Sequence, residues 1–412
     1  MLPFFLISSV FAILILLHLI GKKFGDAVLY VTLFSVILKI AIGVLNKTHG
    51  PLPGADVDAV AFETVALGLS QYWSWTGIDF LDLTDRYSYS NVLAILFYVD
   101  GYSIILVPLF NTALATFASY NVFLIANTLK IDKRNIFLIA LILGLNPIII
   151  LYSAVPMREA PIYAVITFFF RVLLSQPRQV KTIWHPALLV SIVIASYLHI
   201  AFVSLALVLV LYGFNASLSI KGILHPRNLI AAILLALIFN FAITSEEFKS
   251  LPRVAKLLDS DTGSLTYESL EAAQLSKSRG EGAYTYPEIS TGLSIVDMAI
   301  VGTYMTTRLV FSPFPWEIRS ASGATIIKVI DLSLQVWLNF LAIRNLRRRD
   351  GRDKMVFLYM MYLLLSLLFG LNTVNDGVAL RHRTKLVWFV ALAAFSPRFL
   401  PRRMLMTKRV NA

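Results

Sequence analysis

A pair of aspartates in the segment GADVD is the first place where the sequence offers reactive side chains. Asp56 and Asp58 stand two positions apart, and Glu63 follows one to two helical turns later. A carboxylate can remove the proton from a sugar hydroxyl, and neighbouring carboxylates can also hold a metal ion. The alternative is a solvated, acidic helix start, since aspartate is favoured at N-caps and in first turns. We treat Asp56 and Asp58 as candidate catalytic bases, whereas Glu63 fits the polar face of a helix.

A second charged motif is Arg158–Glu159, directly after Pro156-Met157, where we expect the outer end of a helix pair. A charge within about a turn of hydrocarbon is costly unless it is paired or functional. Arg158 can bind a phosphate through two parallel hydrogen bonds, with Glu159 beside it as a contact to the substrate. The alternatives are a structural interaction between these two side chains, or an arginine that reaches to lipid headgroups.

The strongest single signal is the segment NTVNDGVALRHR, which we place just before the last membrane span. Arg381 and Arg383 flank His382 here, against the usual excess of basic residues on the inner side. The two arginines can hold a pyrophosphate, and the histidine can give or accept a proton. The alternative is anchoring to anionic headgroups of the outer leaflet.

A fourth motif lies in a long polar segment that turns aromatic towards its end. Arg279 stands in the run Arg-Gly-Glu-Gly, and Arg308 and Trp316 follow near two prolines. Glycines and a carboxylate suit a loop that binds an acceptor, and aromatic rings stack on sugars. An ordinary loop at the membrane interface explains the same composition equally well.

Several kinds of chemistry are left without support. The chain has no cysteine, which excludes disulfides, thiolate nucleophiles and Cys-based metal sites. It has no Walker A, HExxH or GxSxG motif, so ATP hydrolysis and familiar protease or lipase chemistry find no basis. We expect no cofactor and no metal site; a divalent ion is compatible with the carboxylates, but no clustered ligands are evident.

The composition shows which elements must position these residues. The chain is 58% hydrophobic and 15% charged, against roughly 45–50% and about 25% in soluble domains. Several apolar runs exceed the roughly 17 residues that a helix needs to cross hydrocarbon. We therefore expect an all-α polytopic membrane protein, with residues 1–412 as a single membrane domain.

About eleven spans fit the hydropathy. Residues 184–214 can form one long kinked helix instead of two short spans on either side of His199. His199 would line the site only if the helix breaks there. We interpret 292–311 as a re-entrant or surface-lying helix. The expected spans are 3–20, 28–45, 104–128, 135–153, 159–174, 184–198, 200–214, 228–244, 325–344, 354–371 and 385–397.

The basic residues set the orientation. The net charge of +12 comes mostly from short loops on one side, including Lys22-Lys23 and the cluster at 344–354, and that side is expected to be cytoplasmic. The charge is thus an orientation signal and not a sign of nucleic-acid binding. We expect a bacterial inner-membrane protein without a cleaved signal peptide, its N-terminus periplasmic and its C-terminus cytoplasmic.

Two long segments, 46–103 and 245–324, then lie outside as periplasmic loops. Loops of this length are usually functional. The stretch GADVDAVAFETVALGLSQ in the first has apolar residues at helical spacing, which predicts an amphipathic helix on the membrane surface. All four motifs are on this outer side.

Four short segments together resemble bacterial membrane proteins of surface-polysaccharide assembly. They are GADVDAVAFETVA, LYSAVPMREAPIYAV at 151–165, LVFSPFPWEIRS at 309–320 and NDGVALRHRTKL at 375–386. The chain looks like the Wzy-type oligosaccharide repeat-unit polymerases and the related GT-C-fold, polyprenyl-linked-sugar glycosyltransferases. The acidic loop follows the second expected span here, whereas GT-C enzymes usually carry it after the first.

The resemblance implies a membrane glycosyltransferase that joins undecaprenyl-pyrophosphate-linked repeat units of O-antigen, capsule or exopolysaccharide on the periplasmic face. It implies a base at Asp56 or Asp58, with His382 as the competing choice. Phosphate contacts would come from Arg158, Arg381 and Arg383. The implied partners are the lipid-linked donor, an acceptor glycan, membrane lipids, a chain-length regulator and a flippase.

Three other functions stay open at this point. A GT-C-type enzyme using undecaprenyl-phosphate-sugar differs only in its donor. A polysaccharide or lipid transporter would have charged or helix-breaking residues at mid-span. A non-catalytic scaffold would tolerate replacement of the outer arginines.

Overall fold

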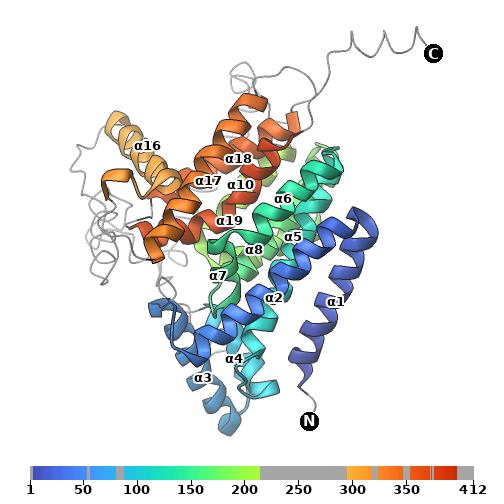
Figure 1. Cartoon of the computed structure of the whole chain (residues 1–412), viewed down its shortest axis with the longest axis vertical. Helices are drawn as coiled ribbons and strands as arrows, with labels where there is room; N and C mark the ends of the chain where they lie inside the picture. The colour runs from blue at the N-terminus through green and yellow to red at the C-terminus, as the bar shows by residue number, and fades with distance from the viewer. Residues whose placement is uncertain are drawn as a thin grey trace.

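The computed structural model describes residues 3–52, 56–79, 88–213, 295–317, 323–346, 353–371, 373 and 375–396. Every element in these ranges is a helix, so the predicted all-α architecture is confirmed for this part of the chain (Figure 1).

Apolar helices of membrane-spanning length dominate the N-terminal half. α1 (Phe4–Phe24), α2 (Asp26–Thr48) and α5 (Leu106–Thr128) are each long and apolar enough to cross a bilayer, as is α17 (Gly323–Leu346) over residues 325–346. Large apolar side chains such as Phe11, Phe34 and Phe340 are exposed on these helices, as lipid-facing residues are. The structure therefore has the helices of a membrane protein.

One further crossing is made of two pieces. α6 (Lys133–Leu145) and α7 (Pro147–Ala154) meet at a bend of 55°. Asn146 starts a new helix at this bend, because its side chain caps α7 by accepting from the backbone N–H groups of Ile148 and Ile149. A proline occupies the first position of α7, where its missing N–H is tolerated. The chain then turns into α8 (Glu159–Ser175), whose first turn carries the second charged motif.

The predicted number of about eleven spans is not confirmed. Four helices in the described ranges pass as spans, or five with the bent pair. α9 (Pro186–Leu198) and α10 (Ser204–Gly213) are each too short to cross alone, and the expected span at 228–244 lies outside the described residues. The chain does break at His199, between α9 and the 3-10 turn η3 (Ile200–Val203).

The first long loop forms a helical hairpin. α3 (Asp56–Thr76) is the predicted helix, and α4 (Ser88–Asp100), which we did not predict, packs along it. Ser90 of α4 donates to the carbonyl of Phe62 on α3, and the backbone N–H of Leu6 in α1 donates to Asp100. In Figure 1 this hairpin lies at the end of the molecule where α1 begins.

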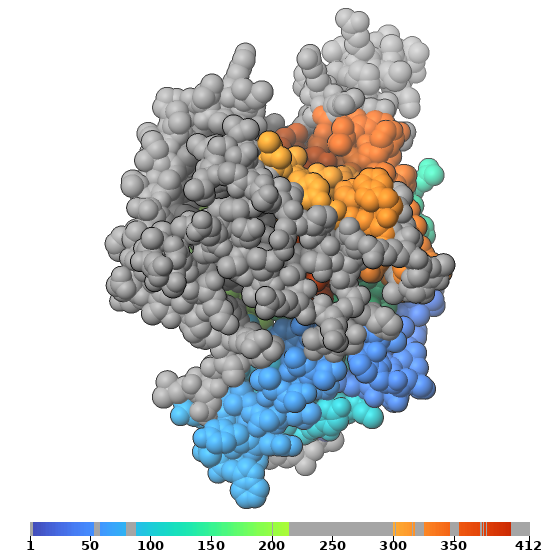
Figure 2. Space-filling model, turned by 90° about the vertical axis from the view of Figure 1, so that its left-hand side faces the viewer, coloured from blue at the N-terminus to red at the C-terminus, as the bar shows by residue number. Residues whose placement is uncertain are grey.

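The C-terminal helices complete the bundle. α16 (Ile295–Phe311) packs on α18 (Asp353–Leu371) and α19 (Asp376–Ala394), and α17 also packs on α19. α19 begins at Asp376, capped by Asn375, so the motif with Arg381 and Arg383 lies inside its first turns and not in a loop before a span. Figure 2 shows the face on which α3 (blue) lies below and α16 (light orange) above.

We predict that Gly43→Ala destabilises the protein by about 1–3 kcal/mol, because α2 passes very close to its neighbours there. A Cβ at position 43 would lie 2.7 Å from Pro108 side-chain carbons and 2.8 Å from the carbonyl oxygen of Ala154. Gly68→Ala on α3 is the matched control: its Cβ would have no neighbour within 4 Å, so helix propensity should leave stability equal or higher. Thermal unfolding in detergent compares the two, and equal melting temperatures would contradict the close packing of α2.

Candidate functional site

The start of α19 places four cationic or protonatable side chains within five positions. Successive residues of an α-helix are rotated by about 100°, so Arg381 and Lys385 share one face while Arg383 points to the opposite one. Each of the three basic side chains pairs with a carboxylate from a different helix. Arg381 pairs with Asp58 of α3, Arg383 with Asp331 of α17, and Lys385 with Glu159 of α8. These pairs define the candidate site, which we call the α19 charge cluster.

The outermost pair joins α19 to the first-loop hairpin. Arg381 forms an ion pair with Asp58, and Tyr152 on α7 also contacts its guanidinium group. The Asp58 side chain is 45% exposed and that of Arg381 18%. This pair is therefore open to solvent and to ligands, and the carboxylate is its more accessible partner.

The inner pair is fully enclosed. Nζ of Lys385 lies 3.3 Å from Oε1 of Glu159, and both side chains are buried. The other carboxylate oxygen of Glu159, Oε2, is buried and has no hydrogen-bond partner among the described residues. Glu159 stands in the first turn of α8, where unpaired backbone N–H groups favour negative charge.

His382 lies between these pairs and an aromatic wall. Its Nδ1 is 3.3 Å from Nζ of Lys385, and its ring stacks on Phe369 with 4.3 Å between ring centroids. His199, half-buried at the break after α9, meets the His382 ring edge-on with 5.7 Å between ring centroids. The break at His199 thus brings a second imidazole to the cluster.

Arg158 closes the cluster from α8. Its Nη1 donates to the carbonyl of Leu198 at 3.2 Å, its guanidinium lies 6.0 Å from the ring centre of Phe62, and it is near enough to interact electrostatically with His382 and Lys385. It does not pair with Glu159, which pairs with Lys385 instead.

Arg383 serves another part of the fold. Its Nη1 lies 3.1 Å from Oδ2 of Asp331, and its Nη2 donates to the carbonyl of Ser312 at 2.6 Å. Asp331 also accepts from Asn146 at the α6–α7 bend. Arg383 and Asp331 are both almost completely buried, so this pair ties α16, α17 and the bend to α19. Arg381 and Arg383 therefore do not face one phosphate together.

The fourth motif is separate from the cluster. Nη1 of Arg308 lies 2.6 Å from Oε1 of Glu317, and its Nε donates to the Tyr304 hydroxyl. Trp316 is 76% exposed and stacks on Phe314 with 4.9 Å between centroids. Arg308 thus supports a short aromatic shelf, which is free to contact a sugar or lipid.

Two predicted site residues cannot be placed in this way. Arg279 lies outside the described residues, and Asp56 begins α3 but its side chain is not among those described. Within the described ranges no group of three or more His, Asp or Glu side chains could hold a metal ion.

Sequence reasoning missed Lys385 and Asp331 as members of charged pairs. The signal was present: three cations within five residues at the start of an apolar helix need buried partners, and Asp331 is a lone acidic residue in an apolar run. Their spacing could show the need for partners, but not which carboxylate meets which cation.

The cluster suits an anion. Apart from the enclosed Arg383–Asp331 pair, the described residues of the cluster bring three cationic side chains together with two carboxylates. The cations are Arg158, Arg381 and Lys385, and the carboxylates are Asp58 and Glu159. A phosphate that approaches from the exposed side reaches the Arg381–Asp58 pair first.

We predict that replacing two arginines on the same helix lowers stability by very different amounts. Arg383→Gln leaves Asp331 buried without its cation and should cost about 3–5 kcal/mol. Arg381→Gln breaks a partly exposed pair and should cost less than about 1 kcal/mol. Thermal or denaturant unfolding of the purified variants tests this, and a loss in Arg381→Gln as large as in Arg383→Gln would show that both pairs are structural.

Comparison with protein-family models, with curated proteins and with solved structures finds no match for this chain. Its function is therefore argued from the α19 charge cluster alone.

Proposed function

We propose that the α19 charge cluster is the active site of a membrane glycosyltransferase that polymerises undecaprenyl-pyrophosphate-linked oligosaccharide units on the periplasmic face. The observation that carries the proposal is the accessible Asp58–Arg381 pair in front of the buried Lys385–Glu159 pair. Such a site offers a carboxylate for a sugar hydroxyl and fixed cations for a phosphate leaving group.

The reaction joins an acceptor hydroxyl oxygen to the anomeric carbon of the donor sugar. The bond from that carbon to the pyrophosphate oxygen breaks, and its electron pair stays on the pyrophosphate. Fixed cations lower the barrier because they meet this developing negative charge. Arg381 and Arg158 supply them at the rim, and Lys385 adds positive potential from behind.

The proton of the acceptor hydroxyl goes to Asp58. In the ion pair this carboxylate is held by Arg381, and an arriving phosphate competes for the same guanidinium group. Donor binding would therefore release Asp58 for the acceptor, which couples the presence of donor to the availability of the base. His382 is the less suitable base because its ring is buried and packed between Phe369 and Lys385.

A donor with one phosphate fits the same groups. The alternative GT-C-type transferase, using undecaprenyl-phosphate-sugar, would employ Asp58 and Arg381 in the same roles. Arg383 is left out of both versions, since its side chain is committed to Asp331.

A transporter is the second candidate, and specific features favour it. Lys39 lies buried in the middle of α2, and the chain is broken both at Asn146 and at His199. Intramembrane charge and discontinuous helices are typical of transporters. In a transporter the outer cluster would bind the anionic headgroup of the cargo.

We expect surface-polysaccharide chains to collapse to single repeat units when a strain lacking this protein carries Asp58→Asn or Arg381→Gln. Gel ladders of the polysaccharide, with protein amounts measured alongside, give the result; Arg344→Gln, an exposed arginine at the end of α17, is the control. Full ladders with normal amounts of both site variants would contradict catalysis at this cluster. Repeat units retained on the inner face would favour the transporter.

We also expect inorganic pyrophosphate to raise the melting temperature of the purified protein. A ligand at about 100 times its Kd adds roughly 2.7 kcal/mol to folding stability. The shift should be larger than with monophosphate if the donor carries a pyrophosphate, and it should be lost in Arg381→Gln. A shift of equal size in wild type and Arg381→Gln would place the anion elsewhere.

A further inference from the structure

Lys39 is a charged residue in the interior of the bundle that the proposed function does not use. It lies in α2 between Asp26 and Lys47, at roughly 20 Å from the start of the helix by the 1.5 Å rise per residue. Its side chain is 3% exposed. In the middle of a span, an ammonium group in such a place is costly unless it is solvated or functional.

No carboxylate of the described residues pairs with Lys39. Its ammonium group donates to the Ser35 hydroxyl one turn earlier, and this is a bond to a neutral group. A lysine ammonium has three N–H donors. The remaining donors face a small cavity between α2, α5 and α6.

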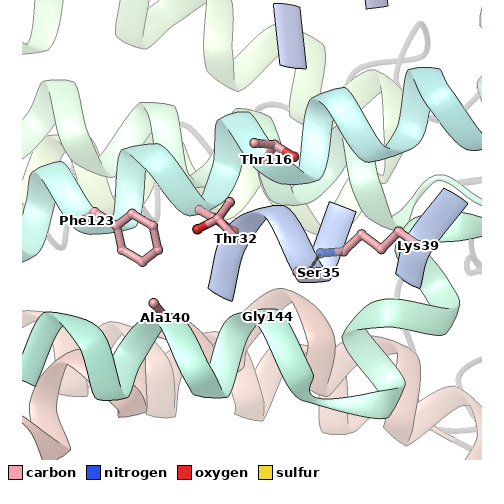
Figure 3. Close-up of a pocket in the computed structure, with 8 residues that line it drawn as sticks. Thr32, Ser35, Lys39, Thr116, Phe123, Ala140 and Gly144 are labelled. Atoms are coloured by element: carbon pink, nitrogen blue, oxygen red, sulfur yellow. Dashed lines mark hydrogen bonds between the residues drawn. The ribbon is translucent and has the colours of Figure 1, made fainter. Parts of the chain in front are cut away.

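The cavity has a volume of about 10 Å³, and four of its eight lining residues carry a hydroxyl group (Figure 3). A site of about 10–15 Å³ holds one water molecule if it offers two to four polar partners. The polar lining comes from α2 and α5, while Ala140 and Gly144 of α6 close the other side. The lining residues are Thr32, Ser35, Lys39, Thr116, Ser119, Phe123, Ala140 and Gly144.

The hydroxyl groups present lone pairs to this space. Thr32 donates to the carbonyl of Val28 at 2.8 Å, and Thr116 and Ser119 likewise donate to carbonyls one turn earlier in α5, at 2.7 and 3.1 Å. Their hydrogens are used within their own helices, so only acceptor positions remain. The cavity thus has N–H donors at the Lys39 end and oxygen acceptors elsewhere.

We propose that this cavity is a binding site for a single water molecule that bridges the Lys39 ammonium group to the Thr116 and Ser119 hydroxyls. A water oxygen accepts one N–H of Lys39 and its two hydrogens meet two hydroxyl lone pairs, so the water has three polar partners. A halide would face the same lone pairs with a repulsive charge, and a metal cation would face the ammonium.

The hydroxyl of Tyr163 on α8 is buried and lies close to Ser119. It does not line the cavity, so it adds to the polar surroundings of Ser119 without contacting the water. Lys39 then keeps its charge inside the bundle through hydration.

The cysteine-free chain allows a direct test through Ser119→Cys, a replacement of nearly equal size. A cysteine thiol reacts in its thiolate form, and it ionises only where water is present. A nearby ammonium group promotes this ionisation of the thiol. Membranes are treated with hydrogen peroxide, an uncharged reagent little larger than water, which oxidises the thiolate to a sulfenic acid and releases hydroxide. The thiols that stay free are then labelled with maleimide after denaturation. Ile37→Cys, on the lipid-exposed side of α2, is the control.

We expect peroxide to oxidise Ser119→Cys roughly tenfold faster or more than Ile37→Cys. Addition of Lys39→Met should slow the reaction roughly tenfold, as a change of one unit in the thiol pKa implies. Thr116→Cys serves if Ser119→Cys does not fold. Reaction as slow as at Ile37→Cys would show that the cavity is dry. A rate unaffected by Lys39→Met would show that water, if it enters, is not held by Lys39; either result overturns the proposal.

Discussion

Ionic groups inside an apolar bundle must find partners, and the C-terminal part of this fold depends on how α19 does so. Arg381 and Lys385 lie on one face of α19 and Arg383 on the opposite face, and each meets a carboxylate from another element. A buried carboxylate without its cation destabilises the folded protein more than the buried ion pair does. The pairs therefore fix which helices lie against α19: α3 at the exposed end, α8 beside it and α17 on the opposite face.

The need to pair buried charges also explains why two arginines close together on α19 have different roles, one structural and one at the proposed site. The Arg383–Asp331 pair is enclosed and is further bonded to Ser312 and, through Asp331, to Asn146, so it has no exposed side for a ligand. The Arg381–Asp58 pair is partly exposed and joins the bundle to a hairpin outside it. A pair that contributes little to stability because water screens it is also one that a phosphate can open. Exposure, and not residue type, distinguishes the two arginines.

Sequence reasoning brought Asp58, Arg158, Arg381 and His382 together because all four lie at the outer ends of apolar runs, and it predicted the helix that carries Asp58. It placed the start of the last helix too late, because the three cations lower the mean hydropathy of the first turns. In the fold α19 can contain these cations because each is paired with a carboxylate. It also gave Arg381 and Arg383 a common task, although two residues apart on a helix point to opposite faces. Glu159 was assigned to the substrate and pairs with Lys385. Such pairings depend on which helices meet, and one sequence without its fold does not contain that information.

Lys39 shows a second way to keep a cation inside the bundle. The α19 cations are neutralised by carboxylates, whereas α2, α5 and α6 offer Lys39 only hydroxyl oxygens around a space of water size. A carboxylate partner would fix the position of its helix, but a hydrated ammonium group depends on a molecule that can leave. The contact of α2 with α5 and α6 thus gains no ion pair from Lys39 and depends on close packing, such as that of Gly43 on Pro108. Around α19, in contrast, ion pairs decide which helices meet, and they hold the cluster in place.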